Sequence, residues 1–143
     1  MKNLLTVCVG NICRSPMAEA LLAQALPQAR VHSAGIGALV GHAADDHAIA
    51  LMKARGLDIS AHRAQQLDTR LCQQHDLLLV MERQHKTFIE QQFPFARGKV
   101  FCLGQFENID IPDPYQQDRA AFEYALQLID QGVATWSQKI ARL

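Results

Sequence analysis

The sequence lacks an excess of charge of either sign. Its 14 basic and 14 acidic side chains cancel, and only 20% of the residues are charged. Proteins that bind nucleic acid or an anionic membrane surface usually carry a basic patch or stripe. We therefore expect neither kind of partner, and any anionic ligand must be held by a local site.

Long hydrophobic runs are also missing. The apolar stretch near the N-terminus covers residues 4–9 and ends at Gly10-Asn11, without the small-residue cleavage site of a signal peptide. It is far shorter than the roughly 20 apolar residues that a membrane-spanning helix needs. We interpret it as a buried strand, and expect a cytoplasmic protein with no direct membrane insertion.

Cysteine and histidine spacings give no support for a metal site. None of the four cysteines lies two positions from another, so a zinc array is not expected. His42 and His47 are five apart, which does not place both on one face of a helix. Without a secretion signal, free thiols in a reducing compartment are the default. We expect no metal and no cofactor.

Apolar runs alternate with helical patterns along the whole chain. Strands are expected at residues 4–9, 30–34, 77–81 and 99–103, and helices at 15–26, 45–56, 83–92 and 118–140. This alternation predicts a single α/β domain over residues 1–143. Its four-stranded parallel sheet would have helices on both faces, in three layers of the flavodoxin or Rossmann kind. Ligands bind such sheets beyond the carboxyl ends of the strands.

Two helix starts are visible in the sequence. Ser15 followed by Pro16 predicts a hydroxyl N-cap with proline at the first helical position. Asp118 predicts the cap of the last helix, whose apolar stripe includes Trp136 and is interpreted as core.

The residues after the first strand have the form C-x5-R-S-P, from Cys8 to Pro16. The spacing alone is weak, but here the cysteine ends a buried strand and the arginine precedes a helix. Such a loop can point successive backbone N–H groups inward and form an anion cradle at the helix N-terminus. The expected phosphate-binding residues are Val9, Gly10, Asn11, Ile12, Cys13, Arg14 and Ser15.

Three residue types in and beyond this loop suit phosphoryl transfer. The guanidinium of Arg14 matches two phosphate oxygens, and Cys8 would face the cradle as a thiolate nucleophile. Gly10 is expected to allow a backbone angle that other residues resist, and Asn11 to tolerate left-handed geometry. Asp113, between Pro112 and Pro114, is a candidate general acid. Taken alone, it could equally be a solvated turn aspartate.

The loop C-V-G-N-I-C-R-S-P resembles that of low-molecular-weight protein tyrosine phosphatases. The resemblance extends through Ser33-Ala34-Gly35, His62-Arg63, Asp76-Leu77 and Asp113-Pro114-Tyr115, and residues 35–41 are most similar to bacterial members that act beside exopolysaccharide export systems. It implies hydrolysis of phosphotyrosine through a phosphocysteine at Cys8. It also implies a protein substrate, a membrane-associated autophosphorylating tyrosine kinase that controls polysaccharide production.

The same resemblance assigns further roles. Leu39 and Tyr115 would form the two walls of the substrate slot, although eukaryotic members usually carry an aromatic residue where Leu39 stands. Asn11, Ser15, Ser33 and His62 would form a hydrogen-bonded support beneath the loop. Ser15 could instead be an ordinary helix cap, and His62 an ordinary half-buried histidine.

Cys13 shares the loop with Cys8, so we hypothesise a reversible Cys8–Cys13 disulfide that protects the nucleophile from further oxidation. Core packing is the alternative role of Cys13.

The rival function is arsenate reduction on the same fold, which needs further paired cysteines, whereas only Cys72 and Cys102 remain. A phosphotransfer carrier or a non-catalytic phosphotyrosine-binding module is less consistent with a nucleophile, a clamp and an acid together. The sequence leaves the oligomeric state open.

Overall fold

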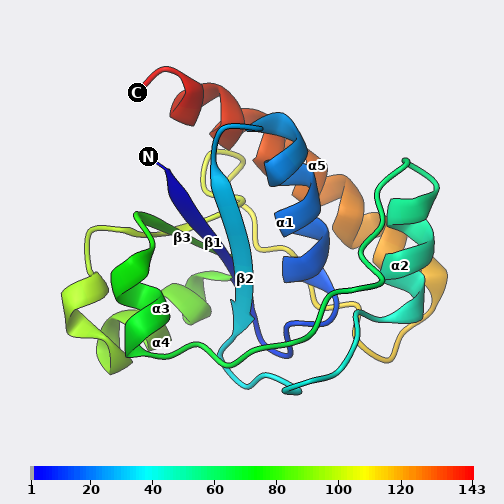
Figure 1. Cartoon of the computed structure of the whole chain (residues 1–143), viewed down its shortest axis with the longest axis horizontal. Helices are drawn as coiled ribbons and strands as arrows, with labels where there is room; N and C mark the ends of the chain where they lie inside the picture. Colours follow the sequence, from blue (N-terminus) through cyan, green and yellow to red (C-terminus); the bar gives the residue numbers. More distant parts are fainter. Residues whose placement is uncertain (1) are drawn as a thin grey trace.

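The computed structural model describes residues 2–143 and contains one parallel sheet (Figure 1). Its strand order is β2-β1-β3-β4, with β1 at the centre. The strands are β1 (Asn3–Cys8), β2 (Arg30–Gly35), β3 (Leu77–Val80) and β4 (Val100–Cys102). The register pairs Cys8 with Gly35, so the last residue of β1 lies beside the last residue of β2.

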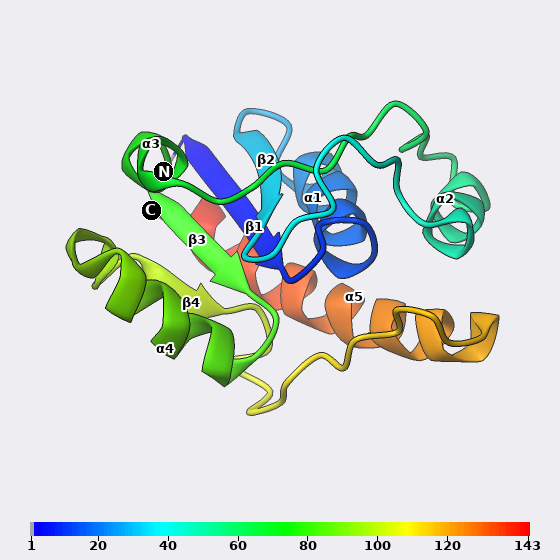
Figure 2. The same ribbon diagram turned by 90° about the horizontal axis from the view of Figure 1, so that it is seen from below.

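Helices cover both faces of the sheet, as predicted (Figure 2). On one face α1 packs against β1, β2 and α5, and α2 packs against α1 and α5. On the other face α4 packs against β3 and β4, and residues of α3 join the same hydrophobic cluster. The helices are α1 (Arg14–Ala25), α2 (Asp46–Lys53), α3 (Thr69–Gln74), α4 (Arg83–Gln92) and α5 (Arg119–Ala141), with a 3₁₀ turn, η1, at Pro94–Ala96.

The central strands are apolar on both faces because both faces are covered. In β1, Leu4 and Cys8 join the cluster under α1 and α5, whereas Leu5 and Val7 join the cluster under α3 and α4. All four residues of β3 are buried. The continuous apolar runs that predicted these strands thus reflect a two-sided core.

The prediction that Ser15 caps the first helix is wrong. Helix α1 begins at Arg14, its N-cap is Cys13, and the Cys13 side chain makes no capping hydrogen bond. The Ser15 hydroxyl is used elsewhere, 2.9 Å from the Sγ of Cys8. The first-turn amides, which have no partner within a helix, are therefore left without a side-chain cap beside the loop.

Other boundaries differ from the prediction by small amounts. Helix α2 ends at Lys53 instead of near Gly56, and β3 and β4 are each shorter than expected. The short elements α3 and η1 were not predicted, since six and three residues show too little periodicity. The cap of α5 is confirmed, because the Asp118 carboxylate accepts a hydrogen bond from the amide of Ala121.

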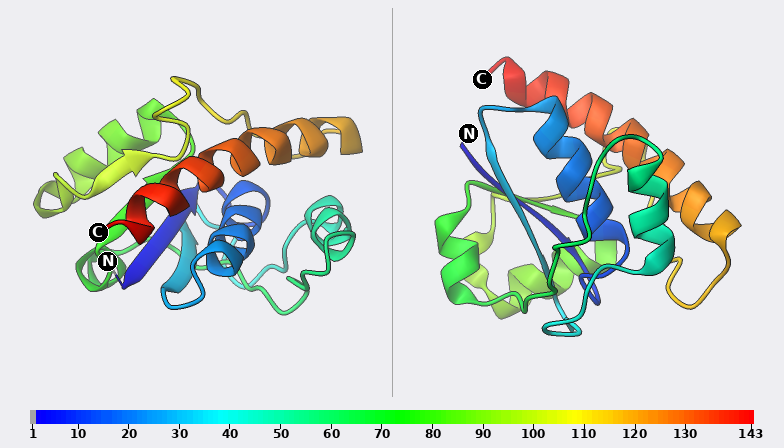
Figure 3. Two further views of the ribbon diagram at one scale, coloured as in Figure 1. Left: turned by 90° about the horizontal axis from the view of Figure 1, so that it is seen from above. Right: turned by 45° about the vertical axis from the view of Figure 1, so that its right-hand side comes forward.

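Helix α5 runs across one side of the molecule, and the loop before it passes the carboxyl end of the sheet (Figure 3). This loop is tied to the residue that follows β3, since the amide of Ile111 donates to the carbonyl of Met81. Residues 110–115 are thereby brought to the edge where β1 ends. Over residues 2–143, no helix is long and apolar enough to cross a membrane.

Candidate active site

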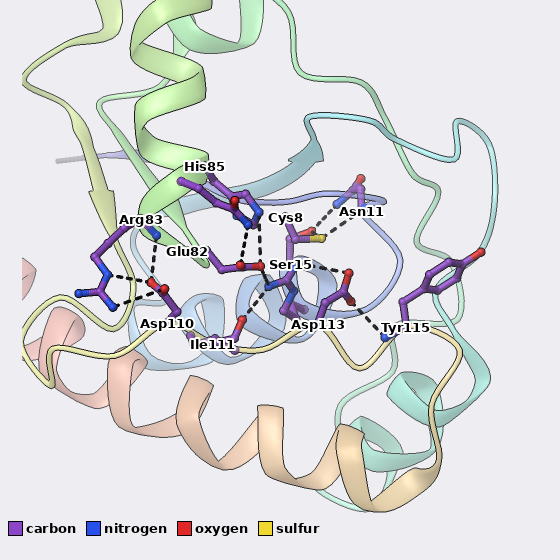
Figure 4. Close-up of polar contacts among 12 residues, drawn as sticks. Cys8, Asn11, Ser15, Glu82, Arg83, His85, Asp110, Ile111, Asp113 and Tyr115 are labelled. Atoms are coloured by element: carbon purple, nitrogen blue, oxygen red, sulfur yellow. Dashed lines mark hydrogen bonds and ion pairs between the residues drawn. The ribbon is translucent and has the colours of Figure 1, made fainter.

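A pocket of about 110 Å³ lies at the carboxyl edge of the sheet. It is formed by the loop after β1, the loop after β2 and the loop before α5. Its lining residues are Cys8, Val9, Gly10, Ile12, Cys13, Arg14, Gly37, Leu39, Asp113 and Tyr115. Residues more than 100 positions apart in the chain therefore share one small cavity, part of whose surroundings is drawn in Figure 4.

Cys8 ends β1 and is only 3% exposed. Its Sγ lies 2.9 Å from the Ser15 hydroxyl and accepts a hydrogen bond of 3.3 Å from the backbone amide of Asn11. Both contacts favour negative charge on sulfur, as does the nearby N-terminus of α1. The environment suits a thiolate nucleophile.

Asn11 organises the loop from beneath. Its φ of 58° lies in the left-handed region, as expected for asparagine. The side-chain amide donates to the hydroxyls of Ser15 and Ser33, at 2.7 and 2.9 Å, and its carbonyl accepts from the amide of Gln65 at 2.9 Å. His62 lies with Nε2 2.7 Å from the Asn11 main-chain carbonyl. The structure therefore brings Asn11, Ser15, Ser33 and His62 together.

The expectation about Gly10 is wrong, because Gly10 has no left-handed φ and a Cβ added there would meet only ordinary contacts. The glycine that the loop requires is Gly35, at the end of β2. A Cβ on Gly35 would clash with the carbonyl oxygen of Val9 and lie 3.1 Å from the Cβ of Asn11. The absent side chain lets the loop after β1 lie directly against β2.

Arg14 is 1% exposed and has one anchored edge and one free edge. Its Nη1 donates to the carboxylate of Glu82 and to the carbonyl of Ile111, each at 2.6 Å. Nε and Nη2 have no hydrogen-bond partner among the described residues. Buried donors of a charged group are costly to leave unpaired. This edge of the guanidinium matches two oxygens of an oxyanion.

Asp113 stands beside Arg14 at the mouth of the pocket. Its Oδ2 lies 3.5 Å from Nη2 of Arg14, an ion-pair contact, and its Oδ1 accepts from the amide of Tyr115 at 3.1 Å. The carboxylate is 40% exposed, so it can exchange protons with solvent. Leu39 and Tyr115 also line the pocket, and the amide of Leu39 is tied to the carbonyl of Gly10.

Cys13 differs from Cys8 in its electrostatics. Burial raises the pKa of the Cys13 thiol far above its ordinary value, and the negative charge of Asp45 raises it further. The Cys13 thiol therefore stays protonated near neutral pH. In the described part of the chain, no three His, Cys, Asp or Glu side chains cluster closely enough to hold a metal ion.

Several residues that shape the site were missed by the sequence analysis, namely Glu19, Gly35, Glu82, His85 and Ile111. Glu82 lies two residues beyond the end of β3, at the ligand-binding edge of the sheet, a position that could have singled it out. Glu19 accepts a hydrogen bond of 2.5 Å from the Ser33 hydroxyl and extends the support under the loop. Gly35 and Ile111 are recognisable only through contacts between segments distant in sequence, and His85 only through its position three residues after Glu82.

Comparison with known proteins agrees with this geometry. Residues 3–143 match the family model "Low molecular weight phosphotyrosine protein phosphatase". The chain is 51% identical over 143 residues to a probable low molecular weight protein-tyrosine-phosphatase, EpsP, of Ralstonia nicotianae, covering 100% of this chain and 99% of that protein.

Solved structures are similar over nearly their whole length. Vibrio vulnificus Wzb in complex with benzylphosphonate is 46% identical with a TM-score of 0.93, covering 96% of this chain and 98% of that one. The YwlE arginine phosphatase of Geobacillus stearothermophilus is 34% identical with a TM-score of 0.92, covering 99% and 94%. The chain belongs to the family of low molecular weight phosphotyrosine protein phosphatases.

Proposed function

We propose that the protein hydrolyses phosphotyrosine with Cys8 as nucleophile, Arg14 as phosphate clamp and Asp113 as general acid. The observation that carries the proposal is the free edge of Arg14, buried in the same pocket as the Cys8 thiol. An oxyanion held there would present its phosphorus to the Sγ of Cys8. The cradle amides of residues 9–15 would hold the phosphoryl oxygens as negative charge shifts in the transition state.

The reaction consists of two displacements. In the first, the Cys8 thiolate forms the S–P bond, the P–O bond to the tyrosine breaks, and Asp113 donates its proton to the departing phenolate. In the second, Asp113 as carboxylate takes a proton from water, which attacks phosphorus and breaks the S–P bond. Inorganic phosphate leaves, and the Ser15 hydroxyl, 2.9 Å away, stabilises the returning thiolate.

The slot favours an aromatic phosphate ester. Leu39 and Tyr115 both line a pocket whose inner end holds Cys8 and Arg14. A flat ring between an aliphatic and an aromatic wall loses contact with water while its phosphate reaches the loop. Phosphoserine would place its phosphate nearer its backbone and would lose these wall contacts.

The protein substrate in this proposal is a membrane-associated, autophosphorylating tyrosine kinase that controls exopolysaccharide or capsule production. Two features support it: the resemblance of residues 35–41 to bacterial members beside such systems, and the similarity to EpsP and Wzb. The phosphatase would act in the cytoplasm, where a kinase domain is phosphorylated and thiols stay reduced. Residues 1–143 would act as one domain.

Oxidation of the site would be reversible. Cys8 and Cys13 line the same pocket, and oxidation of Cys8 to a sulfenic acid by peroxide would let the Cys13 thiol form a disulfide with loss of water. Mass spectrometry after mild peroxide treatment should find the Cys8–Cys13 link and recovery of activity with thiol reductant. Overoxidised Cys8 without the link would contradict this role of Cys13.

Arsenate reduction is the weaker alternative. Cys72 and Cys102 belong to the hydrophobic cluster under α3 and α4, whereas Cys8 and Cys13 belong to the cluster on the opposite face of the sheet. A relay of disulfides between these two pairs would have to cross the sheet. The geometry therefore favours hydrolysis.

The test compares three phosphopeptides, carrying phosphotyrosine, phosphoserine or phosphoarginine, in the presence of a chelator. The phosphoarginine peptide is included because a similar structure is an arginine phosphatase. We expect metal-independent turnover of phosphotyrosine alone, abolished in Cys8→Ser. In Asp113→Asn, the loss should be larger for phosphotyrosine than for an ester with a good leaving group, which needs no proton. Preferential turnover of phosphoarginine, or none by folded protein, would refute the proposal.

A further inference from the structure

Arg14 is anchored on the side opposite the pocket by two acceptors. Its Nη1 donates to the Oε2 of Glu82 and to the carbonyl of Ile111. These contacts set the direction of Nε and Nη2, which have no hydrogen-bond partner among the described residues and can donate to an oxyanion. A planar guanidinium with one fixed edge has a fixed second edge, so the anchors determine how the clamp faces the pocket.

Glu82 is itself held by neighbours on its own helix. It is the N-cap residue of α4, where the helix dipole favours a negative charge. Its Oε1 accepts a hydrogen bond of 2.9 Å from Gln84, and its Oε2 lies 3.4 Å from the Nε2 of His85 (Figure 4). Because Gln84 is at the surface, His85 is the buried support of this carboxylate.

His85 is 4% exposed, and Nε2 is its ring nitrogen nearest to an acceptor. Its Nδ1 is buried and has no partner among residues 2–143, so a proton there would be unpaired. Burial lowers the pKa of His85, and the charge of Arg14 lowers it further, against the opposing effects of Glu82, Asp113 and Asp110. The lowered pKa favours the neutral ring, and Nε2 is the ring nitrogen that lies beside the Glu82 carboxylate.

We infer that His85 is a positioning residue for phosphate binding, which holds Glu82 so that Glu82 holds Arg14. This inference rests on the proposed role of Arg14 as the phosphate clamp. His85 touches neither the pocket nor the substrate. Without its Nε2–H, the carboxylate of Glu82 can rotate about its side-chain bonds, and the free edge of Arg14 loses its fixed direction.

The experiment compares two substitutions of His85 that differ in reach. His85→Gln places an amide N–H near the position of Nε2, whereas the shorter amide of His85→Asn cannot reach Glu82. The matched control is His75→Leu, because His75 is 5% exposed, lies near His32 and Leu71, and is not part of the pocket. Each variant is measured for the dissociation constant of inorganic phosphate by calorimetry, for kcat and KM, and for its melting temperature.

We expect His85→Asn to weaken phosphate binding and to lower kcat/KM, each by about tenfold, the size expected when a polar contact to a charged group is lost. His85→Gln should restore both values to within about threefold of wild type, since its amide N–H can take the place of Nε2 beside the Glu82 carboxylate. His75→Leu should lower the melting temperature and leave phosphate binding unchanged.

Two outcomes would overturn the inference. One is that His85→Asn loses melting temperature but binds phosphate as tightly as wild type. The other is that His85→Gln is as impaired as His85→Asn. The phosphate measurement needs no turnover, so it separates this inference from the proposed function. If the variants show the expected pattern of phosphate binding but the wild-type protein does not hydrolyse phosphotyrosine, the function alone is refuted. Wild-type protein that does not bind phosphate would refute both the function and the inference.

Discussion

Asn11→Ala should cost more stability than an ordinary buried polar substitution, because Asn11 combines a strained backbone with a connected side chain. Its side chain makes three hydrogen bonds, to Ser15, Ser33 and Gln65. With about 1 kcal/mol for each bond and about 1 kcal/mol for placing alanine at a φ of 58°, the expected loss is about 3–5 kcal/mol. Total stabilities are only about 5–15 kcal/mol, so the variant should fold but be marginal.

The control for this prediction is Asn108→Ala. Asn108 has nearly the same φ, 56°, and is exposed, so it should lose only the backbone contribution of about 1 kcal/mol. Urea unfolding of both variants can be followed by the fluorescence of Trp136, the single tryptophan of the chain, which is buried. Asn11→Ala should also lose most phosphatase activity. If its unfolding free energy falls no further than that of Asn108→Ala, the hydrogen bonds beneath the loop do not stabilise the fold.

Three further predictions concern other parts of the site and the fold. Gly35→Ala should destabilise the protein by about 1–3 kcal/mol and displace the loop after β1, because the added Cβ would clash with the Val9 carbonyl. The control Gly37→Ala, whose Cβ would meet only a distant contact, should unfold in urea like wild type. Equal losses of unfolding free energy in both variants would contradict the steric argument. Leu39→Phe should lower KM for an aryl phosphate about two- to tenfold, because the phenylalanine ring would stack on the substrate ring, and kcat should stay nearly unchanged. An unchanged or higher KM would mean that residue 39 does not face the substrate ring. Hydrogen bonds from the main-chain amides of Asn3 and Lys2 lower the pKa of Asp76 in the folded protein. The Asp76 carboxylate therefore stabilises the fold above the ordinary pKa of an aspartate, and this stabilisation is lost as pH falls through the folded-state pKa. Wild type should therefore be more stable to urea than Asp76→Asn at pH near 6, and this advantage should shrink as pH falls below about 3.9, the ordinary pKa of an aspartate; a gap that is independent of pH would refute the linkage.

Much of the fold could be predicted from local sequence patterns. The apolar runs predicted all four strands to within about two residues, and the alternation with helices predicted a parallel sheet covered on both faces. These features are local, because burial on two faces leaves an apolar run in the strand itself. The short elements α3 and η1 were not predicted, because six and three residues are too few to show a hydrophobic periodicity.

Within the loop, local chemistry predicted some details and misjudged others. The left-handed conformation of Asn11 followed from its side chain, but Ser15 was assigned to a helix cap and Gly10 to a special backbone angle. Both errors have one cause. The Ser15 hydroxyl is used by Cys8 and Asn11 within the folded loop, and the space for the loop depends on Gly35, which the sheet brings against it.

The sequence by itself predicted the order of the four strands and of the longer helices, the place of the C-x5-R loop at the end of β1, and the residues proposed as nucleophile, clamp and acid. Only the tertiary structure decided which way Arg14 faces, because its anchors Glu82 and Ile111 lie 68 and 97 positions away. It likewise decided that His85 lies beside Glu82 while Nε and Nη2 of Arg14 have no hydrogen-bond partner among residues 2–143. A buried charge takes its direction from the partners that packing places around it, and those partners come from elements that meet only when the sheet has formed.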